Sequence, residues 1–129
     1  MSWDVALIKT KTNQEKLDEI KETVSFSKTE FMDVLTNQYP STIVNDRSWI
    51  VMDTEKYLIE FNIGKEENID CIMMHIRRSN PREVIEFLCA NLQCRAIDIS
   101  KTEFIDSKKA TSFETWQKFK DKVIGNIKK

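Results

Sequence analysis

The amino-acid sequence predicts a single α+β domain over residues 1–129, an antiparallel β-meander sheet with helices packed mainly on one face. Three observations lead to this prediction. A chain of 129 residues with 40% hydrophobic side chains can fill one core. Three successive stretches in its middle alternate between apolar and polar residues, as strands do. Other stretches combine helix caps with an apolar stripe at helical spacing.

Four stretches are typical of β-strands. The first, residues 2–9, alternates from Trp3 onward, and we expect one of its faces to be fully buried. Residues 47–53, 56–64 and 69–78 follow as strands joined by short polar turns. The middle one of these separates its apolar from its polar side chains: Tyr57, Ile59, Phe61 and Ile63 against Glu60 and Asn62. This pattern indicates a sheet with one covered face and one wetter face.

Two helices are predicted around these strands, and residues 13–24 indicate either a short surface helix or a structured loop. Residues 25–40 are a clearer helix, because Ser27 or Thr29 can cap it and Glu30 can complete a capping box. Residues 80–92 have Asn80 or Ser79 as the cap and Pro81 at the first helical position. The inner stripe of this second helix is expected to be Val84, Ile85, Leu88, Asn91 and Leu92.

The last third of the chain predicts a short hairpin and a third helix. Residues 94–100 and 102–106 form the two arms of the hairpin. Residues 112–129 predict a helix that Ser112 or Thr111 caps. Its apolar stripe consists of Phe113, Trp116, Phe119, Val123 and Ile127. The tryptophans are interpreted as residues of the core or its edge: Trp3, Trp49 and Trp116.

Charge is distributed unevenly along the chain. Residues 1–107 have a net charge of −6, and residues 108–129 have a net charge of +5. Contacts with phosphates need cations clustered over a binding face, so we expect no direct contact with nucleic acid. An acidic body favours a basic protein partner instead.

Five acidic residues lie in and around the predicted strands 47–53 and 56–64: Asp53, Glu55, Glu60, Glu66 and Glu67. One interpretation is a charged edge that prevents pairing with strands of other molecules. The other is an acidic docking patch, which makes these five residues the candidate partner-binding site. Both interpretations stay open at this point.

The sequence predicts no catalytic, cofactor-binding or metal-binding residues. The only histidine is His75, and Cys71 lies roughly 13 Å from it along a strand, too far to share a metal ion. Cys89 and Cys94 lie on the two sides of a predicted helix end and form no CxxC pair. Two isolated glycines cannot make a phosphate-binding loop, and no spacing selects an acid–base pair of carboxylates.

The segment IMMHIRRSNPREV, residues 72–84, suggests either an anion site or the passage from a strand to a helix. Its arginines are Arg77, Arg78 and Arg82. The first two point to opposite faces of a strand, and the third opposes the macrodipole at a helix start. We therefore favour the second interpretation, in which the arginines pair with nearby acids such as Glu83 or Glu86.

Cysteine usage and the chain start indicate the compartment. Three cysteines without a CxxC pair are typical of reduced thiols in a cytosolic protein. The first residues lack the basic and apolar segments of a signal peptide. No apolar run approaches the ~20 residues that span a bilayer. We therefore expect a cytoplasmic protein that does not contact a membrane.

Five segments in order, from Met1 to about Val123, resemble small immunity proteins of bacterial polymorphic-toxin and contact-dependent growth inhibition systems. The segments are MSWDVALIK, YLIEFNIG, CIMMHIRRSNPREVIEFLC, CRAIDISKTEFID and FETWQKF. The resemblance implies a protein that is not an enzyme and needs no cofactor. It implies that the chain, as a monomer or homodimer, binds a cognate toxin domain, in many such systems a basic nuclease, and blocks it by stoichiometric contact.

Two other functions remain open from the sequence. A small enzyme would use His75 together with Cys71 or an arginine, and these side chains would then converge in a pocket. An adaptor would dock a basic helix or tail on its acidic surface.

Overall fold

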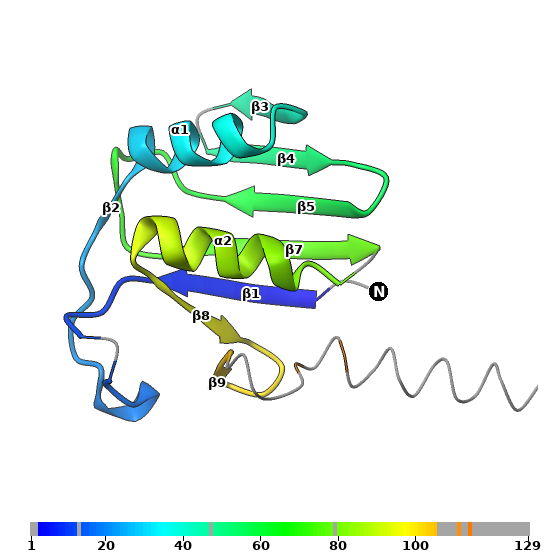
Figure 1. Cartoon of the computed structure of the whole chain (residues 1–129). Helices are drawn as coiled ribbons and strands as arrows, with labels where there is room; N and C mark the ends of the chain where they lie inside the picture. Colours follow the sequence, from blue (N-terminus) through cyan, green and yellow to red (C-terminus); the bar gives the residue numbers. More distant parts are fainter. Residues whose placement is uncertain are drawn as a thin grey trace, which may run out of the picture.

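The computed structural model describes residues 3–12, 14–46, 48–78, 80–105, 111 and 114, and these residues form an α+β domain (Figure 1). Its main sheet contains β1 (Trp3–Ile8), β3 (Thr42–Asp46), β4 (Trp49–Asp53), β5 (Tyr57–Asn62), β7 (Ile72–Arg78), β8 (Arg95–Asp98) and β9 (Glu103–Phe104). A second, two-stranded sheet pairs β2 (Phe26–Ser27) with β6 (Asn68–Ile69). The helices are α1 (Lys28–Gln38), α2 (Arg82–Leu92) and the 3₁₀ turn η1 (Leu17–Glu19).

The seven strands of the main sheet lie in the order β3-β4-β5-β7-β1-β8-β9, and each neighbouring pair is antiparallel. The predicted meander is present in β4, β5 and β7, and β3 extends it at the edge of the sheet. The first strand of the chain, β1, then pairs with β7 on one side and with β8 on the other. Segments that are far apart in the sequence therefore lie side by side in the sheet.

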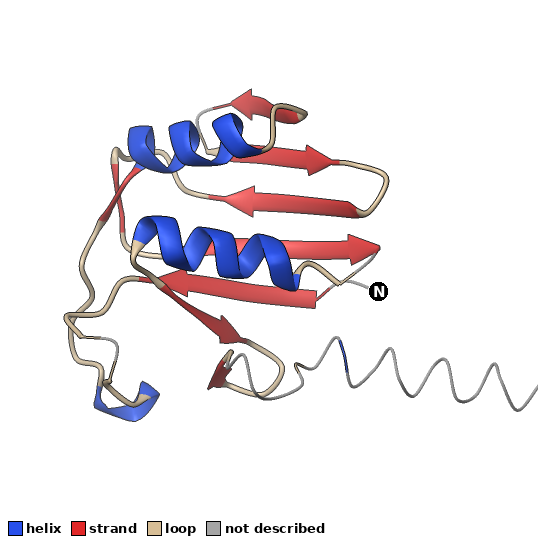
Figure 2. Ribbon diagram, in the orientation of Figure 1, coloured by secondary structure: helices blue, strands red, loops and turns tan. Residues whose placement is uncertain are grey.

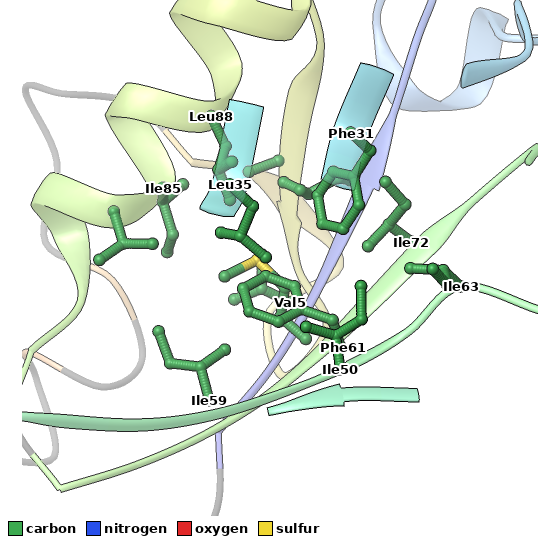
Figure 3. Packing of buried hydrophobic residues seen from close by; sticks show 14 of the residues in the cluster. Val5, Phe31, Leu35, Ile50, Ile59, Phe61, Ile63, Ile72, Ile85 and Leu88 are labelled. Carbon is green, nitrogen blue, oxygen red and sulfur yellow. The ribbon is translucent and has the colours of Figure 1, made fainter. Parts of the chain in front are cut away.

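Both α-helices cover the same face of the sheet, as the sequence predicted (Figure 2). The core lies between this face and the helices (Figure 3), and on β5 the side chains of Tyr57, Ile59 and Phe61 alternate into it. Phe31 of α1 packs edge-to-face on Phe61 with ring centroids 5.6 Å apart. Leu88 of α2 is fully buried, so truncating it to alanine would cost roughly 2–5 kcal/mol.

The start of α1 follows the predicted cap, whereas α2 begins one residue later than predicted: Pro81 is its N-cap, and Arg82 is its first helical residue. The Ser27 hydroxyl accepts a hydrogen bond from the Glu30 N–H at 3.3 Å. The Asn80 side chain accepts one from the Arg82 N–H at 3.1 Å. The buried residues of α2 are Val84, Ile85, Leu88 and Leu92, as predicted. Asn91 was wrongly placed on this stripe: it is exposed, and its amide donates to the Phe87 carbonyl at 2.8 Å.

Some elements differ from the prediction or refine it. Strand β3 was missed because only two of its residues, Ile43 and Val44, are apolar, and both are largely exposed at the edge of the sheet. Residues 13–24 contain only the short turn η1 among their described residues. Most of the predicted third helix, residues 112–129, lies outside the described residues. Thr111 and Glu114 nonetheless exchange the two hydrogen bonds of a capping box, at 3.2 and 3.0 Å.

No helix within the described part of the chain is long and apolar enough to cross a membrane.

Candidate binding face of the sheet

The face of the main sheet that points away from α1 and α2 is divided into a covered and an uncovered part. Over β1 and β8, Ala6, Ile8 and Ile97 form a small apolar cluster. Leu17 and Phe104 are among the side chains that pack on this cluster and shield it from water.

The uncovered part, here called the open face, extends over β3, β4, β5, β7 and the start of β1. Its side chains alternate with the buried ones along each strand, and all of them are partly or largely exposed. They are Asp4, Ile43, Trp49, Val51, Asp53, Leu58, Glu60, Asn62, Met73, His75 and Arg77. The open face thus combines one tryptophan and several aliphatic side chains with a short row of ionisable groups.

That row crosses three strands and has a defined geometry. Asp4 of β1 is the register partner of His75 on β7, which is in turn the partner of Glu60 on β5. The Nδ1 atom of His75 lies 2.8 Å from Oδ1 of Asp4. The Trp49 indole stacks on the imidazole, with ring centroids 6.4 Å apart and an angle of 23° between the rings. The acid and the indole together fix the orientation of the imidazole.

The structure does not bring the five predicted docking acids together. Asp53 and Glu55 lie at one end of the β4–β5 hairpin, and Glu66 and Glu67 follow the other end of β5. A strand of this length extends for ~20 Å, which separates the two pairs. Glu60 lies between them, and of the five acids Asp53 and Glu60 belong to the open face.

Two of these acids make contacts within the fold. The Asp53 carboxylate accepts a hydrogen bond from Arg78 at 2.7 Å. The Glu67 carboxylate accepts from the Thr29 N–H at 3.2 Å and from the Ser27 hydroxyl at 3.0 Å, which helps to cap α1. These hydrogen bonds, first among them that of the Thr29 N–H, hold the pKa of Glu67 below its usual value. Glu67 therefore has a structural role beside any role in binding.

Two of the three arginines after His75, Arg78 and Arg82, contact acids, as the favoured interpretation predicts. Arg82 contacts Glu114 at 2.5 Å and, less closely, Glu86 at 3.8 Å. Glu83 was also named as a possible arginine partner, but its carboxylate accepts a hydrogen bond from the Tyr57 hydroxyl. Partial burial, followed by this contact with Glu83, raises the pKa of Tyr57 to about 12.

The chain matches no family model, no curated protein and no solved structure. The geometry of the open face and the sequence are therefore the grounds for assigning it a function.

Chemical alternatives find little support in the described residues. Among them, no group of three His, Cys, Asp or Glu side chains is placed to hold a metal ion. One hollow of about 370 Å³ lies beside the loop after β5 and includes Glu66, Asp70 and Cys71 in its lining. A second, of about 420 Å³, lies at the end of α2 and includes Cys89 and Cys94. His75 lines neither of these two hollows.

Sequence reasoning missed the open face as a unit. Trp3 is buried and Trp49 is partly buried, which agrees with the predicted places in the core or at its edge, and Trp116 lies outside the described residues. A signal was present in β4, where Trp49 and Val51 alternate with the buried Ile50 and Met52. No comparable signal joins Asp4 to His75, because they are 71 residues apart and meet only through strand pairing.

Proposed function

We propose that this chain is a non-enzymatic immunity protein that binds a cognate toxin domain in the cytoplasm and neutralises it by stoichiometric contact. The observation that carries the proposal is the open face, where a tryptophan and several aliphatic side chains remain accessible on a regular sheet. Exposed apolar groups that are contiguous and rimmed by polar ones are typical of protein-binding surfaces. The ordered resemblance to immunity proteins supplies the class of partner.

Trp49 is the side chain best suited to anchor a partner. Tryptophan is enriched among the residues that dominate binding energies. Its indole already rests on the imidazole of His75, which Asp4 orients, so little conformational entropy is lost when a partner covers it. The neighbouring Val51 and Leu58 enlarge the apolar contact area.

The charge of the face favours a basic partner. Its acids Asp4, Asp53 and Glu60 outnumber its one arginine, Arg77, and residues 1–107 have a net charge of −6. A basic toxin domain, such as a nuclease, would be attracted to such a surface and would associate rapidly at low salt. Glu55 and Glu66, which lie beyond the ends of β5, would contribute to this attraction from the periphery.

Co-expression tests the proposal as a whole. The toxin domain encoded immediately upstream is produced with and without this chain in the same cells. We expect the chain to restore growth and to co-purify with the toxin in equal amounts. No rescue and no complex would refute the proposal.

Single substitutions test the role of the open face. Trp49→Ala should weaken toxin binding by about 30-fold or more, because truncating an anchor costs roughly 2 kcal/mol. Glu60→Arg should weaken it by a similar factor, because it reverses a charge that attracts the basic partner. Asp33→Arg is the matched control, since Asp33 is exposed on α1, on the other side of the sheet. Circular dichroism verifies that all three variants fold. If Asp33→Arg weakens binding and the two face variants do not, the contact surface is the helical side.

A small enzyme is the second candidate function, and the His75–Asp4 pair is the observation in its favour. A carboxylate on Nδ1 orients an imidazole so that its other nitrogen can act on a substrate. Titration of toxin activity separates the two functions. Stoichiometric binding requires one molecule of this chain for each toxin molecule, whereas an enzyme would inactivate toxin at far smaller ratios.

A further inference from the structure

Cys89 and Cys94 are brought together by the way in which α2 ends. Gln93, between the helix and β8, has a positive φ angle of 52°, in the left-handed region. The N–H groups of Gln93 and Cys94 both donate to the Cys89 carbonyl, the latter at 3.1 Å. The Cys94 bond is the six-to-one bond of a Schellman-type helix end, which brings the first and the sixth residue of this turn close together. The two cysteines are these first and sixth residues.

The two thiols lie at the same helix end and differ in their surroundings. Cys94 is only 7% exposed, and its sulfur lies 3.7 Å from the Leu88 carbonyl. Cys89 is half-buried on the last turns of the helix. Both line the 420 Å³ hollow, together with Thr10, Thr12 and Gln93, so a small molecule can reach the pair from solvent.

The pKa values of the two thiols also differ. Cys89 is the more acidic thiol, as the first nucleophile of a two-step exchange should be. The neighbouring Cys94 thiol lowers the pKa of Cys89. The neighbouring Cys89 thiol, followed by burial, raises the pKa of Cys94. The third thiol, Cys71, is exposed and lies elsewhere, and partial desolvation followed by the charge of Asp70 raises its pKa. Because the thiolate is the nucleophile, Cys89 is the thiol that should react first.

We propose that Cys89 and Cys94 form a thiol–disulfide exchange site for small disulfides of the glutathione class. The Cys89 thiolate attacks one sulfur of the small disulfide, whose S–S bond breaks and releases one thiolate. The Cys94 sulfur then attacks the Cys89 sulfur of the mixed disulfide and releases the second thiolate. Both released thiolates take up the protons that the two cysteines lose. The protein gains one disulfide, and the small disulfide is reduced to two thiols.

The product joins the end of α2 to the start of β8. Neither cysteine belongs to the open face, so exchange at this site is independent of the proposed partner contact.

Oxidised glutathione is the probe that tests this site. The reduced full chain is incubated with it, quenched with acid, alkylated and mapped by mass spectrometry. We expect a Cys89–Cys94 disulfide, formed at least about tenfold faster than any modification of Cys71. A Cys94→Ser variant should instead accumulate one glutathionyl group on Cys89. Cys94→Ala provides the same test with a less polar replacement at this buried position.

Two controls isolate the roles of the thiols. Cys71→Ser should form the disulfide at the wild-type rate. Cys89→Ser should leave Cys94 unmodified over the same period. The proposal is overturned if Cys71 reacts as fast as Cys89, if no adduct forms on Cys89 in the Cys94 variants, or if Cys94 reacts at the wild-type rate without Cys89.

Discussion

Replacing Glu114 by glutamine is expected to lower the free energy of unfolding at neutral pH by about 2 kcal/mol. The Glu114 carboxylate accepts hydrogen bonds from Arg82 Nε at 3.0 Å, from Arg82 Nη2 at 2.5 Å and from Asn80 Nδ2 at 2.7 Å. The Arg82 and Glu114 side chains are only 21% and 19% exposed. Glutamine retains an oxygen that can accept from the Thr111 N–H, so the substitution removes the charge and permits this cap bond.

The magnitude follows from the pKa of Glu114. Hydrogen bonds from Arg82, with smaller contributions from Thr111 and Asn80, lower this pKa from 4.5 to about 2. A shift of one pKa unit corresponds to ~1.4 kcal/mol, which gives an upper bound of about 3.4 kcal/mol. Water screens an ion pair at the edge of the fold, and this reduces the expected contribution to about 2 kcal/mol.

The same shift predicts a pH dependence. Because the pKa of Glu114 is lower in the folded than in the unfolded chain, the stabilisation is complete above pH 4.5 and is lost as the pH falls toward about 2. The difference in stability between the wild-type chain and Glu114→Gln should therefore shrink over this range.

Urea unfolding, followed by tryptophan fluorescence at several pH values, measures both effects. Glu86→Gln is the matched control, because Glu86 contacts the same arginine at 3.8 Å and its side chain is 55% exposed. An exposed pair of this kind contributes only ~0.3–0.5 kcal/mol. Equal losses for the two variants, or a loss in Glu114→Gln that does not change with pH, would refute the reasoning.

Three further substitutions test the fold. Glu67→Ala should lower the melting temperature, because its carboxylate caps α1, whereas Glu66→Ala should not; equal melting curves would contradict the cap. Gly64→Ala should cost about 1 kcal/mol in urea unfolding, because its φ of 73° strains any side chain although no atom crowds the site. Trp3→Phe should cost ~1–3 kcal/mol, because Asp98 loses the indole donor at 3.0 Å; an unchanged midpoint would show that water replaces it.

Much of the fold follows from local patterns in the sequence. Alternation located β5, and the buried residues Tyr57, Ile59 and Phe61 follow it without exception. The start of α1 was predictable because a serine cap and its partner lie three residues apart, and Ser27 makes the predicted bond with the Glu30 N–H. These signals are local, so a single sequence is enough to find them.

Features that depend on the meeting of distant segments were not predictable in this way. Five acids close together in sequence suggested one patch, yet β5 places Glu55 and Glu66 beyond its opposite ends. The cysteine pair at the end of α2 depends on the left-handed conformation of Gln93, and glutamine is not a residue that signals this conformation. In both examples, spacing along the chain does not predict which residues meet, because the contacts depend on the path of the backbone.

The open face illustrates how this limit affects the inference of function. A period of two assigns each residue of a strand to one of two faces, and in β7 it correctly sends His75 away from the buried Ile76. This alternation does not show whether the second face of the sheet is covered. In this chain the coverage depends on β1, which brings Asp4 to His75, and on Leu17, which is among the side chains that pack over the neighbouring apolar cluster. His75 was interpreted from sequence as architecture alone, but its place beneath the indole of Trp49 makes it part of the surface that a partner would meet.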